Sequence, residues 1–291
     1  MRAAPAPTRT RDLIALCKPG IVRMCLVTTL GGIWLAPRSA DWLTVSAVLL
    51  GSAMAVAAAG AFNMALERLP DQKMARTADR PVAAGRVSVL TAVRFGFALS
   101  LASLVVLAAG TNLLTTVLAA AAIISYVLIY TPMKYRSPLA LFVGAFPGAV
   151  PPLLGWTAVM GTVDPPGLVL AAILLVWQMP HSLAIVSRRV DDYARAGVRC
   201  VPVARGQAVT RVQATIWAAV LVPVSLLLAP LGVAGWLYFF GALALSLGYF
   251  FCAAWGFFRS SDGRWATVLF FASLLYLPAL TVVLIVDALV A

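Results

Sequence analysis

The chain is a succession of long apolar runs separated by short polar segments. Each run has the roughly 20 residues, with few charges, that a helix needs to cross the hydrocarbon core of a bilayer. The pattern therefore predicts an all-α polytopic membrane bundle of about nine transmembrane helices. The runs cover approximately residues 21–37, 42–65, 92–110, 113–131, 138–157, 166–186, 214–230, 233–257 and 267–290.

The composition supports this prediction and excludes several other protein classes. Hydrophobic residues make up 62% of the 291 residues and charged residues 11%, whereas soluble domains are about 45–50% apolar and about 25% charged. A disordered chain, a disulfide scaffold and an ordinary soluble enzyme are therefore excluded. Nine spans use most of the chain, so we predict a single integral-membrane domain over residues 1–291. The four cysteines lack the paired spacing of a zinc site.

The basic residues predict how the bundle is oriented. The chain has 22 Lys and Arg against 10 Asp and Glu. With nine spans, 21 of the 22 fall on one side of the membrane and Arg38 alone falls on the other. The positive-inside rule then places the N-terminal tail, 1–20, and the two long connections, 66–91 and 187–213, in the cytoplasm. Because the charges lie in short segments between apolar runs, nucleic acid is not expected as a partner.

The first long connection carries a candidate metal site. Asn63, Glu67 and Asp71 stand four residues apart, which lines one face of a helix over two turns. Mg²⁺ binds one or two carboxylates together with substrate phosphates, and basic residues follow at once in the sequence. Pro70 precedes Asp71 and is expected to kink or end the helix. The alternative is a solvated loop whose acids pair with its bases.

The second long connection is less regular. Asp191 and Asp192 are adjacent and diverge by about 100° on a helix, so only one of them can face the first cluster. Arg188, four residues before Asp192, is a candidate ion-pair partner. His181 is the only histidine and lies one turn from Trp177 on the same helix face. A structural hydrogen-bonding role for His181 is the alternative to a binding role.

Several motifs together resemble one family. Over nearly its whole length the chain resembles the UbiA-type membrane prenyltransferases and, within them, the protoheme IX farnesyltransferases (haem O synthases). The motifs are Lys18-Pro19, N-x-x-x-E-x-x-x-D-x-K-M-x-R-T-x-x-R-P over 63–81, YTPMK over 130–134, GAFPGAVPPLLGW over 144–156, WQMPH over 177–181, DYARAG over 192–197 and FASLLYL over 271–277.

The resemblance implies a Mg²⁺-dependent transfer of a farnesyl group from farnesyl diphosphate to a vinyl group of haem B, which makes haem O. It implies metal binding by Asn63, Glu67 and Asp71, with Asp192 and Tyr193 completing the catalytic set. Trp177 and His181 are expected to line the acceptor pocket. The wider family has D-x-x-x-D in the second loop, but Arg188 stands at the first position here, which argues against a second Mg²⁺. The residues expected to bind the diphosphate are Lys73, Arg76, Arg80, Lys134 and Arg188.

The expected partners are farnesyl diphosphate and haem B as substrates, the lipid bilayer of the bacterial cytoplasmic (inner) membrane, and haem A synthase or terminal oxidase assembly proteins. Three other functions are considered. A prenyltransferase acting on a quinone precursor or other lipid is disfavoured by the W-Q-M-P-H and D-Y segments. A transporter would place its binding site near the bilayer midplane, whereas the ionisable residues gather at one face. A non-catalytic oxidase assembly factor would show no dependence on a diphosphate.

Overall fold

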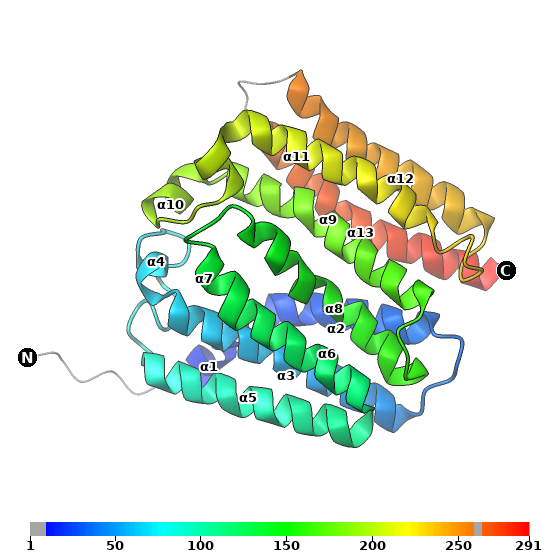
Figure 1. Ribbon diagram of the computed structural model, residues 1–291, viewed down its shortest axis with the longest axis horizontal. Helices are drawn as coiled ribbons and strands as arrows, with labels where there is room; N and C mark the ends of the chain where they lie inside the picture. The colour runs from blue at the N-terminus through cyan, green and yellow to red at the C-terminus, as the bar shows by residue number, and fades with distance from the viewer. Residues whose placement is uncertain (1–9, 259–263, 291) are drawn as a thin grey trace, which may run out of the picture.

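The computed structural model describes residues 10–258 and 264–290, and within them it contains helices and no β-strand (Figure 1). The predicted all-α class is confirmed. The helices are α1 (Thr10–Leu16), α2 (Pro19–Leu35), α3 (Trp42–Leu66), α4 (Arg68–Gln72), α5 (Val89–Gly110), α6 (Leu113–Ile124), the π-helical η1 (Ser125–Tyr130), α7 (Thr131–Met133), α8 (Ala140–Met160), α9 (Pro165–Ser187), α10 (Val190–Arg195), α11 (Val201–Leu226), α12 (Trp236–Ala254), the 3-10 helix η2 (Trp255–Phe257) and α13 (Arg264–Val290).

The membrane spans agree with the apolar runs. In the part of the chain that the structure describes, eight helical segments are long and apolar enough to cross a membrane, counting α6–η1–α7 and α12–η2 as one segment each. Helices α1 and α2 form a broken pair, bent by 50°, that adds a ninth. The bend is at Lys18, whose φ of 52° lies in the left-handed region, and Pro19 begins α2. The protein is an integral membrane protein of about nine spans.

The second long connection differs from the prediction. Instead of a loop over 187–213, α10 occupies part of it, and α11 begins at Val201 rather than near residue 214. The reason is that hydropathy reports immersion in lipid, not helicity. The first turns of α11 carry Arg205, Gln207 and Arg211 and project beyond the apolar part of the helix. Gly206, with φ 80°, interrupts the helix there.

The two long connections lie at one end of the bundle, where Figure 1 shows α4 and α10 close together. Met74 of the first connection is buried in one cluster with Ala196 and Val198 of the second. The N–H of Arg199 donates to the carbonyl oxygen of Lys134 at 2.8 Å, which ties the second connection to the segment after α7. Residues far apart in sequence thus form one compact layer over this end of the bundle.

Helices α2 and α8 touch through their backbones. A Cβ atom added to Gly32 would lie 2.0 Å from the carbonyl oxygen of Pro152, and one added to Gly155 would lie 2.0 Å from that of Thr29. Small residues allow this close approach of membrane helices. The contact holds α2 firmly against α8, and both helices form walls of the cavities described below.

The C-terminal helices α9, α11, α12 and α13 share one large apolar core. Near the far end of α13, the buried carboxylate of Asp287 accepts hydrogen bonds from the backbone N–H groups of Gly235 (2.6 Å) and Tyr238 (3.0 Å). These donors lie at the start of α12 and have no partner within their own helix. Asp287 therefore caps α12 from a neighbouring helix and joins the C-terminal end of α13 to the start of α12.

The charge pattern predicts which end of the bundle faces the cytoplasm, and this prediction is directly testable. In a cysteine-free background, Ala75→Cys and Ser39→Cys place single thiols at exposed positions in the first long connection and between α2 and α3. We expect a membrane-impermeant thiol reagent to label Ser39→Cys in intact cells and Ala75→Cys only after permeabilisation, because the charge pattern predicts that the basic end faces the cytoplasm. Labelling of both in intact cells would contradict the predicted topology.

The α2–α8 contact predicts an asymmetric response of two adjacent glycines. We expect Gly32→Ala to lower the thermal midpoint by several degrees, since its methyl group overlaps a backbone carbonyl that cannot rotate away. Gly31→Ala is the matched control, because a Cβ there meets nothing within 4 Å. Thermal unfolding in detergent, followed by size-exclusion fluorescence, measures both. Equal midpoints for the two variants would show that the contact is not tight.

Candidate active site

A polar cavity of about 250 Å³ lies beneath the layer formed by the two long connections. The ends of α3 and α9 contribute to its wall, as do the bend between α1 and α2, the segment after α7, and the second connection. Acidic, basic and amide side chains therefore meet at one end of an otherwise apolar bundle. Those that line it are Lys18, Asn63, Glu67, Asp71, Arg76, Arg80, Lys134 and Arg199, together with the phenols of Tyr126, Tyr130, Tyr135 and Tyr193.

The three predicted metal ligands come together on a nearly continuous helix. The N–H of Glu67 donates to the carbonyl oxygen of Asn63 at 2.9 Å, and the N–H of Asp71 donates to that of Glu67 at 2.8 Å. The helical register therefore persists from α3 into α4 despite the missing N–H of Pro70, and α4 ends only at Gln72. All three residues are buried, with 2%, 7% and 1% of their surface exposed for Asn63, Glu67 and Asp71.

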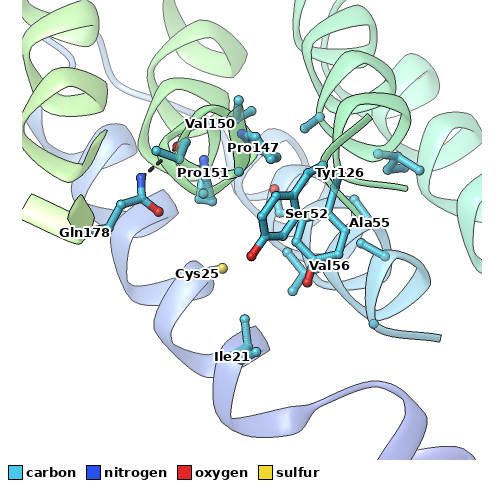
Figure 2. Close-up of a pocket in the computed structure, with 18 of the residues that line it drawn as sticks. Ile21, Cys25, Ser52, Ala55, Val56, Tyr126, Pro147, Val150, Pro151 and Gln178 are labelled. Carbon is cyan, nitrogen blue, oxygen red and sulfur yellow. Dashed lines mark hydrogen bonds between the residues drawn. The ribbon is translucent and has the colours of Figure 1, made fainter. Parts of the chain in front are cut away.

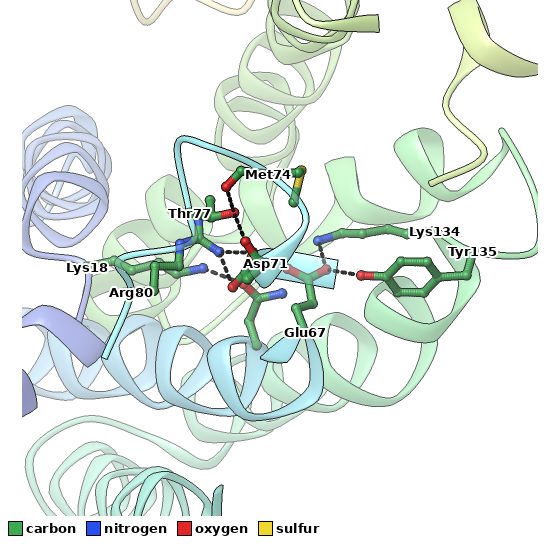
Figure 3. Close-up of polar contacts among 9 residues, drawn as sticks. Lys18, Glu67, Asp71, Met74, Thr77, Arg80, Lys134 and Tyr135 are labelled. Carbon is green, nitrogen blue, oxygen red and sulfur yellow. Dashed lines mark hydrogen bonds and ion pairs between the residues drawn. The ribbon is translucent and has the colours of Figure 1, made fainter. Parts of the chain in front are cut away.

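Each of these three side chains carries one basic partner (Figure 3). Lys134 Nζ donates to Glu67 Oε1 at 2.7 Å, and Lys18 Nζ donates to Asn63 Oδ1 at 2.6 Å. Arg80 Nη1 donates to both carboxylate oxygens of Asp71, at 2.9 and 2.8 Å. The alternative to a metal site was a solvated loop whose acids pair with its bases. The acids are indeed paired with bases, but the pairs are buried around a cavity and are not solvated.

The two carboxylates respond differently to burial. Burial raises the pKa of Asp71, and the Coulombic attraction and hydrogen bond of Arg80 offset this only in part. Burial also acts to raise the pKa of Glu67, but the Coulombic attraction of Lys134 and Lys18, together with the hydrogen bond from Lys134, outweighs it, so the pKa is lowered. Glu67 is therefore held firmly as an anion.

The donor set suits a magnesium ion that is shared with a phosphate ligand. Within residues 10–258 and 264–290, no group of three or more His, Cys, Asp or Glu side chains could hold a metal by itself. Two carboxylates and an amide oxygen nevertheless match the preference of Mg²⁺, which leaves further positions to water and substrate phosphates. The buried Nδ2 of Asn63 has no hydrogen-bond partner, so a ligand with acceptor oxygens would satisfy it.

Lys18 is a site residue that the sequence reasoning did not assign. It lies 45 residues from Asn63, and only the Lys18-Pro19 pair pointed to it. Its place depends on the bend between α1 and α2, and on Gly60 of α3. A Cβ at Gly60 would lie 2.8 Å from the carbonyl oxygen of Leu16 and 3.3 Å from Lys18 Cγ. The tertiary approach of α3 to this bend therefore brings the ammonium group into the site.

A second, apolar cavity of about 250 Å³ adjoins the polar one and extends into the bundle (Figure 2). Lys18, Tyr126 and Tyr130 line both cavities. Its wall comes from α2, α3, α6, α8 and α9, and includes Pro147 and Pro151 of the glycine- and proline-rich helix α8. A charged chamber that opens into an apolar one is complementary to a ligand with an anionic head and a hydrocarbon tail.

The remaining predicted phosphate-binding and catalytic residues are divided between the cavity and the surface. Arg76 and Tyr193 line the polar cavity, whereas Lys73 is exposed outside it. Arg188 and Asp192 lie in a separate polar hollow formed by the α9–α10 corner.

Asp192 does not pair with Arg188. Its carboxylate contacts Arg195, and Arg189 Nη1 lies 4.0 Å away. Helix α9 ends at Ser187, and Arg189 is non-helical with φ −140°. The four-residue spacing between Arg188 and Asp192 therefore does not run along one helix, which is why the expected pair does not form.

Trp177 and His181 lie side by side on α9, as their spacing predicted, but they face α13. Trp177 Nε1 donates to the carbonyl oxygen of Ser273 at 3.0 Å, and His181 Nδ1 lies 2.7 Å from Ser273 Oγ. Their neighbours Gln178 and Ser182 line the apolar cavity instead. The acceptor role of Trp177 and His181 remains a prediction.

Comparison with known proteins identifies close relatives along the whole chain. The chain is 44% identical over 286 residues to a protoheme IX farnesyltransferase of Myxococcus xanthus, covering 98% of this chain and 97% of that protein. It is 45% identical over 289 residues to a protoheme IX farnesyltransferase of Anaeromyxobacter sp., covering 99% and 97%.

Solved structures share the fold at lower identity. A digeranylgeranylglyceryl phosphate synthase superposes with a TM-score of 0.79 at 18% identity, over 97% of this chain and 99% of that one. A UbiA homologue from Archaeoglobus fulgidus bound to GPP and Mg²⁺ gives 0.65 at 17% identity, over 94% and 99%. The UbiA prenyltransferase family profile matches residues 25–275. The buried acid–base site, the fold and the match over most of the chain lead to one conclusion: the protein belongs to the UbiA prenyltransferase family.

Proposed function

We propose that this protein transfers a farnesyl group from farnesyl diphosphate to a vinyl group of haem B and so makes haem O. The observation that carries the proposal is the polar cavity, with its acidic and basic side chains, opening into an apolar cavity. The first chamber suits a diphosphate and the second suits a prenyl chain. The relatives named protoheme IX farnesyltransferase, at 44% and 45% identity over nearly their full lengths, support haem as the acceptor.

In this proposal Asn63, Glu67 and Asp71 hold Mg²⁺. Their side-chain chemistry supports this role, as does the Archaeoglobus homologue, which is bound to GPP and Mg²⁺. When bound, the ion would offset the negative charge that develops on the leaving diphosphate. The carboxylates are buried and close to the cavity wall, where charge interactions are stronger than in water.

The basic residues have two successive roles in the proposal. In the structure as it stands, Arg80 and Lys134 form ion pairs with the carboxylates of Asp71 and Glu67, and Lys18 donates to the amide oxygen of Asn63. With Asn63, Glu67 and Asp71 holding a metal ion, the same three cations would donate to the diphosphate instead. Arg76 lines the same cavity and joins them. Lys73 and Arg188 would reach the diphosphate only if their segments moved.

The residues of the apolar cavity protect the reacting carbon. As the C–O bond of the allylic diphosphate breaks, the diphosphate leaves. The π electrons of the vinyl group then join its outer carbon to the farnesyl carbon that carried the diphosphate. The positive charge left on the inner vinyl carbon is conjugated with the macrocycle, and addition of water there releases one proton. A dry cavity keeps water from capturing the prenyl cation first. The apolar lining contributed by α3, α6 and α8 provides that exclusion.

The remaining assignments concern the acceptor and the cell. Asp192 and Tyr193 are proposed to support the site from the second connection, and Trp177 and His181 are proposed to line the haem pocket. The basic end of the bundle supports placement in a bacterial cytoplasmic membrane with this end inside. Haem A synthase or terminal oxidase assembly proteins are the proposed protein partners.

The direct test is an assay of purified protein with farnesyl diphosphate, haem B and Mg²⁺, with the product mass read by spectrometry. We expect Asp71→Ala to lower turnover by at least about 100-fold, because losing a metal ligand removes several kcal/mol of charge stabilisation. Asp79→Ala is the matched control, since Asp79 lies in the same connection with a side chain that is 95% exposed. Chelation of divalent ions should abolish turnover of the unaltered protein, and added Mg²⁺ should restore it.

Two results would contradict the metal assignment and the proposed function separately. Near-normal turnover of Asp71→Ala would exclude Asp71 as an essential ligand. A product formed with a quinone precursor but not with haem B would replace the acceptor while retaining the class of reaction.

Lys18 gives an independent prediction. We expect Lys18→Met to raise the KM for farnesyl diphosphate by about 10-fold or more, because a charge-assisted hydrogen bond to phosphate is lost. Arg23→Met is the control, since Arg23 is an exposed cation five residues further along, in α2. Steady-state kinetics at saturating haem B measures both. An unchanged KM in Lys18→Met would show that this ammonium only donates a hydrogen bond to Asn63.

A further inference from the structure

The apolar cavity has a mouth at the polar site and a floor inside the bundle. The mouth is at Tyr130, which lines the polar cavity as well. On the three walls formed by α3, α6 and α8, the lining residues farthest from the basic end are Ser52, Ala119 and Leu154. We call these three residues the floor. Figure 2 shows Ser52 among the side chains that line the cavity. A prenyl chain that enters from the diphosphate site therefore ends against the floor.

Helix α8 gives the depth of the cavity. Gly144 lies level with the mouth, because a Cβ atom there would be 2.4 Å from Tyr130 Cε2. From Gly144 to Leu154, the rise of an α-helix gives a depth of about 15 Å. An extended chain reaches about 1.2 Å per bond, so a farnesyl main chain of about 12 carbons spans roughly 13 Å. A geranylgeranyl main chain of about 16 carbons spans roughly 18 Å. The farnesyl chain therefore fits above the floor, and the geranylgeranyl chain is too long.

Close-packed side chains lie behind the floor. Leu154 and Ala119 belong to one buried cluster, and each residue of this cluster used here is at most 8% exposed. The cluster members behind them are Val48, Leu107 and Ala158. Protein interiors of this kind have few voids, and extra carbon atoms can enter them only by displacing side chains. A prenyl chain longer than the cavity would therefore have to break apart this cluster.

The backbone that carries Leu154 is also held in place. Two residues before it, the carbonyl oxygen of Pro152 would lie 2.0 Å from a Cβ atom on Gly32 of α2. One residue after it, a Cβ atom on Gly155 would lie 2.0 Å from the carbonyl oxygen of Thr29. The α2–α8 contact thus locks α8 on both sides of Leu154. Because the helix has no room to shift, the depth of the floor is fixed.

We propose that Leu154, with Ser52 and Ala119 beside it, determines the length of the prenyl group that this protein accepts. The inference rests on the proposed function, because it takes the apolar cavity as the site of the prenyl chain. A floor at this depth accepts a farnesyl group and excludes a geranylgeranyl group by steric overlap. A geranyl group enters but leaves the apolar surface near the floor uncovered, so it binds less tightly.

The experiment titrates geranyl, farnesyl and geranylgeranyl diphosphate into the purified full-length protein with Mg²⁺ and without haem, and measures each affinity by calorimetry. We expect the unaltered protein to bind farnesyl diphosphate about 10-fold more tightly than either of the others. Leu154→Ala should raise the affinity for geranylgeranyl relative to farnesyl diphosphate by about 10-fold or more, because it opens the floor. Leu153→Ala is the matched control, since Leu153 is a buried neighbour outside the cavity lining.

A second variant raises the floor instead of opening it. The buried Oγ of Ser52 has no hydrogen-bond partner among the residues that the structure describes, so Ser52→Val loses no hydrogen bond. The added methyl group occupies space at the end of the cavity. We expect Ser52→Val to weaken the binding of farnesyl diphosphate by about 10-fold and to leave that of geranyl diphosphate nearly unchanged. This variant decides the question alone if Leu154→Ala fails to fold, and size-exclusion profiles and thermal midpoints show which variants are folded.

Two results would overturn the inference. One is a folded Leu154→Ala protein that keeps the chain-length preference of the unaltered protein. The other is an equal loss of affinity for geranyl and farnesyl diphosphate in Ser52→Val. The proposed function has a separate readout, which is the mass of the product formed with haem B. Absence of farnesylated haem would overturn the function while the donor affinities still decide the role of the floor. Normal product with unaltered preferences in both variants would overturn only the inference.

Discussion

The fold of this protein depends on burying two carboxylates at the end of an apolar bundle without leaving either one unpaired. Removing a carboxylate from water is costly unless a cation and hydrogen bonds replace the lost solvation. Glu67 pairs with Lys134, and Asp71 pairs with Arg80. Beside them, Lys18 donates a hydrogen bond to the amide oxygen of Asn63. Since these cations come from three separate segments, the site is complete only when all three segments fold together.

That requirement accounts for the organisation of the loop end. The two long connections pack on each other through Met74, Ala196 and Val198, and the N–H of Arg199 donates to the carbonyl oxygen of Lys134. The layer they form covers the charged cavity and limits the access of water, which strengthens the ion pairs beneath it. The same pairs hold the side-chain oxygens that are proposed to bind a metal ion. Stability of the resting site and readiness for the proposed reaction thus depend on the same side chains.

Helix α9 separates the proposed site of the prenyl chain on one face from the proposed site of the acceptor on the other. Gln178 and Ser182 face the apolar cavity beside α8, while Trp177 and His181 face α13. The close α2–α8 contact at Gly32 and Gly155 fixes one wall of this cavity. The cap that Asp287 provides for α12 holds the far end of α13. These contacts give α9 rigid neighbours on both faces, which is what precise placement of two large substrates requires.

The sequence by itself determined the spans and the spacing of the three proposed metal ligands. Hydropathy reveals helices in lipid because every backbone polar group there must be satisfied within the helix. The four-residue intervals from Asn63 to Asp71 survived Pro70 because the proline lies in the first turn of α4, where the loss of one N–H is tolerated. Both features are local, and local patterns are readable without the fold.

Only the tertiary structure decided which distant groups complete the site. Lys18 meets Asn63, 45 residues away in sequence, because of the bend before α2 and the close approach of Gly60 to it. Asp192 joins Arg195 rather than Arg188 because the helix breaks between them. The helical start of α11 escaped hydropathy since its charged first turns lie beyond the apolar stretch. Each of these features depends on how separate helices pack against one another. The periodicity of residues along the chain shows which of them share a helix face. It does not show which distant helix that face will meet.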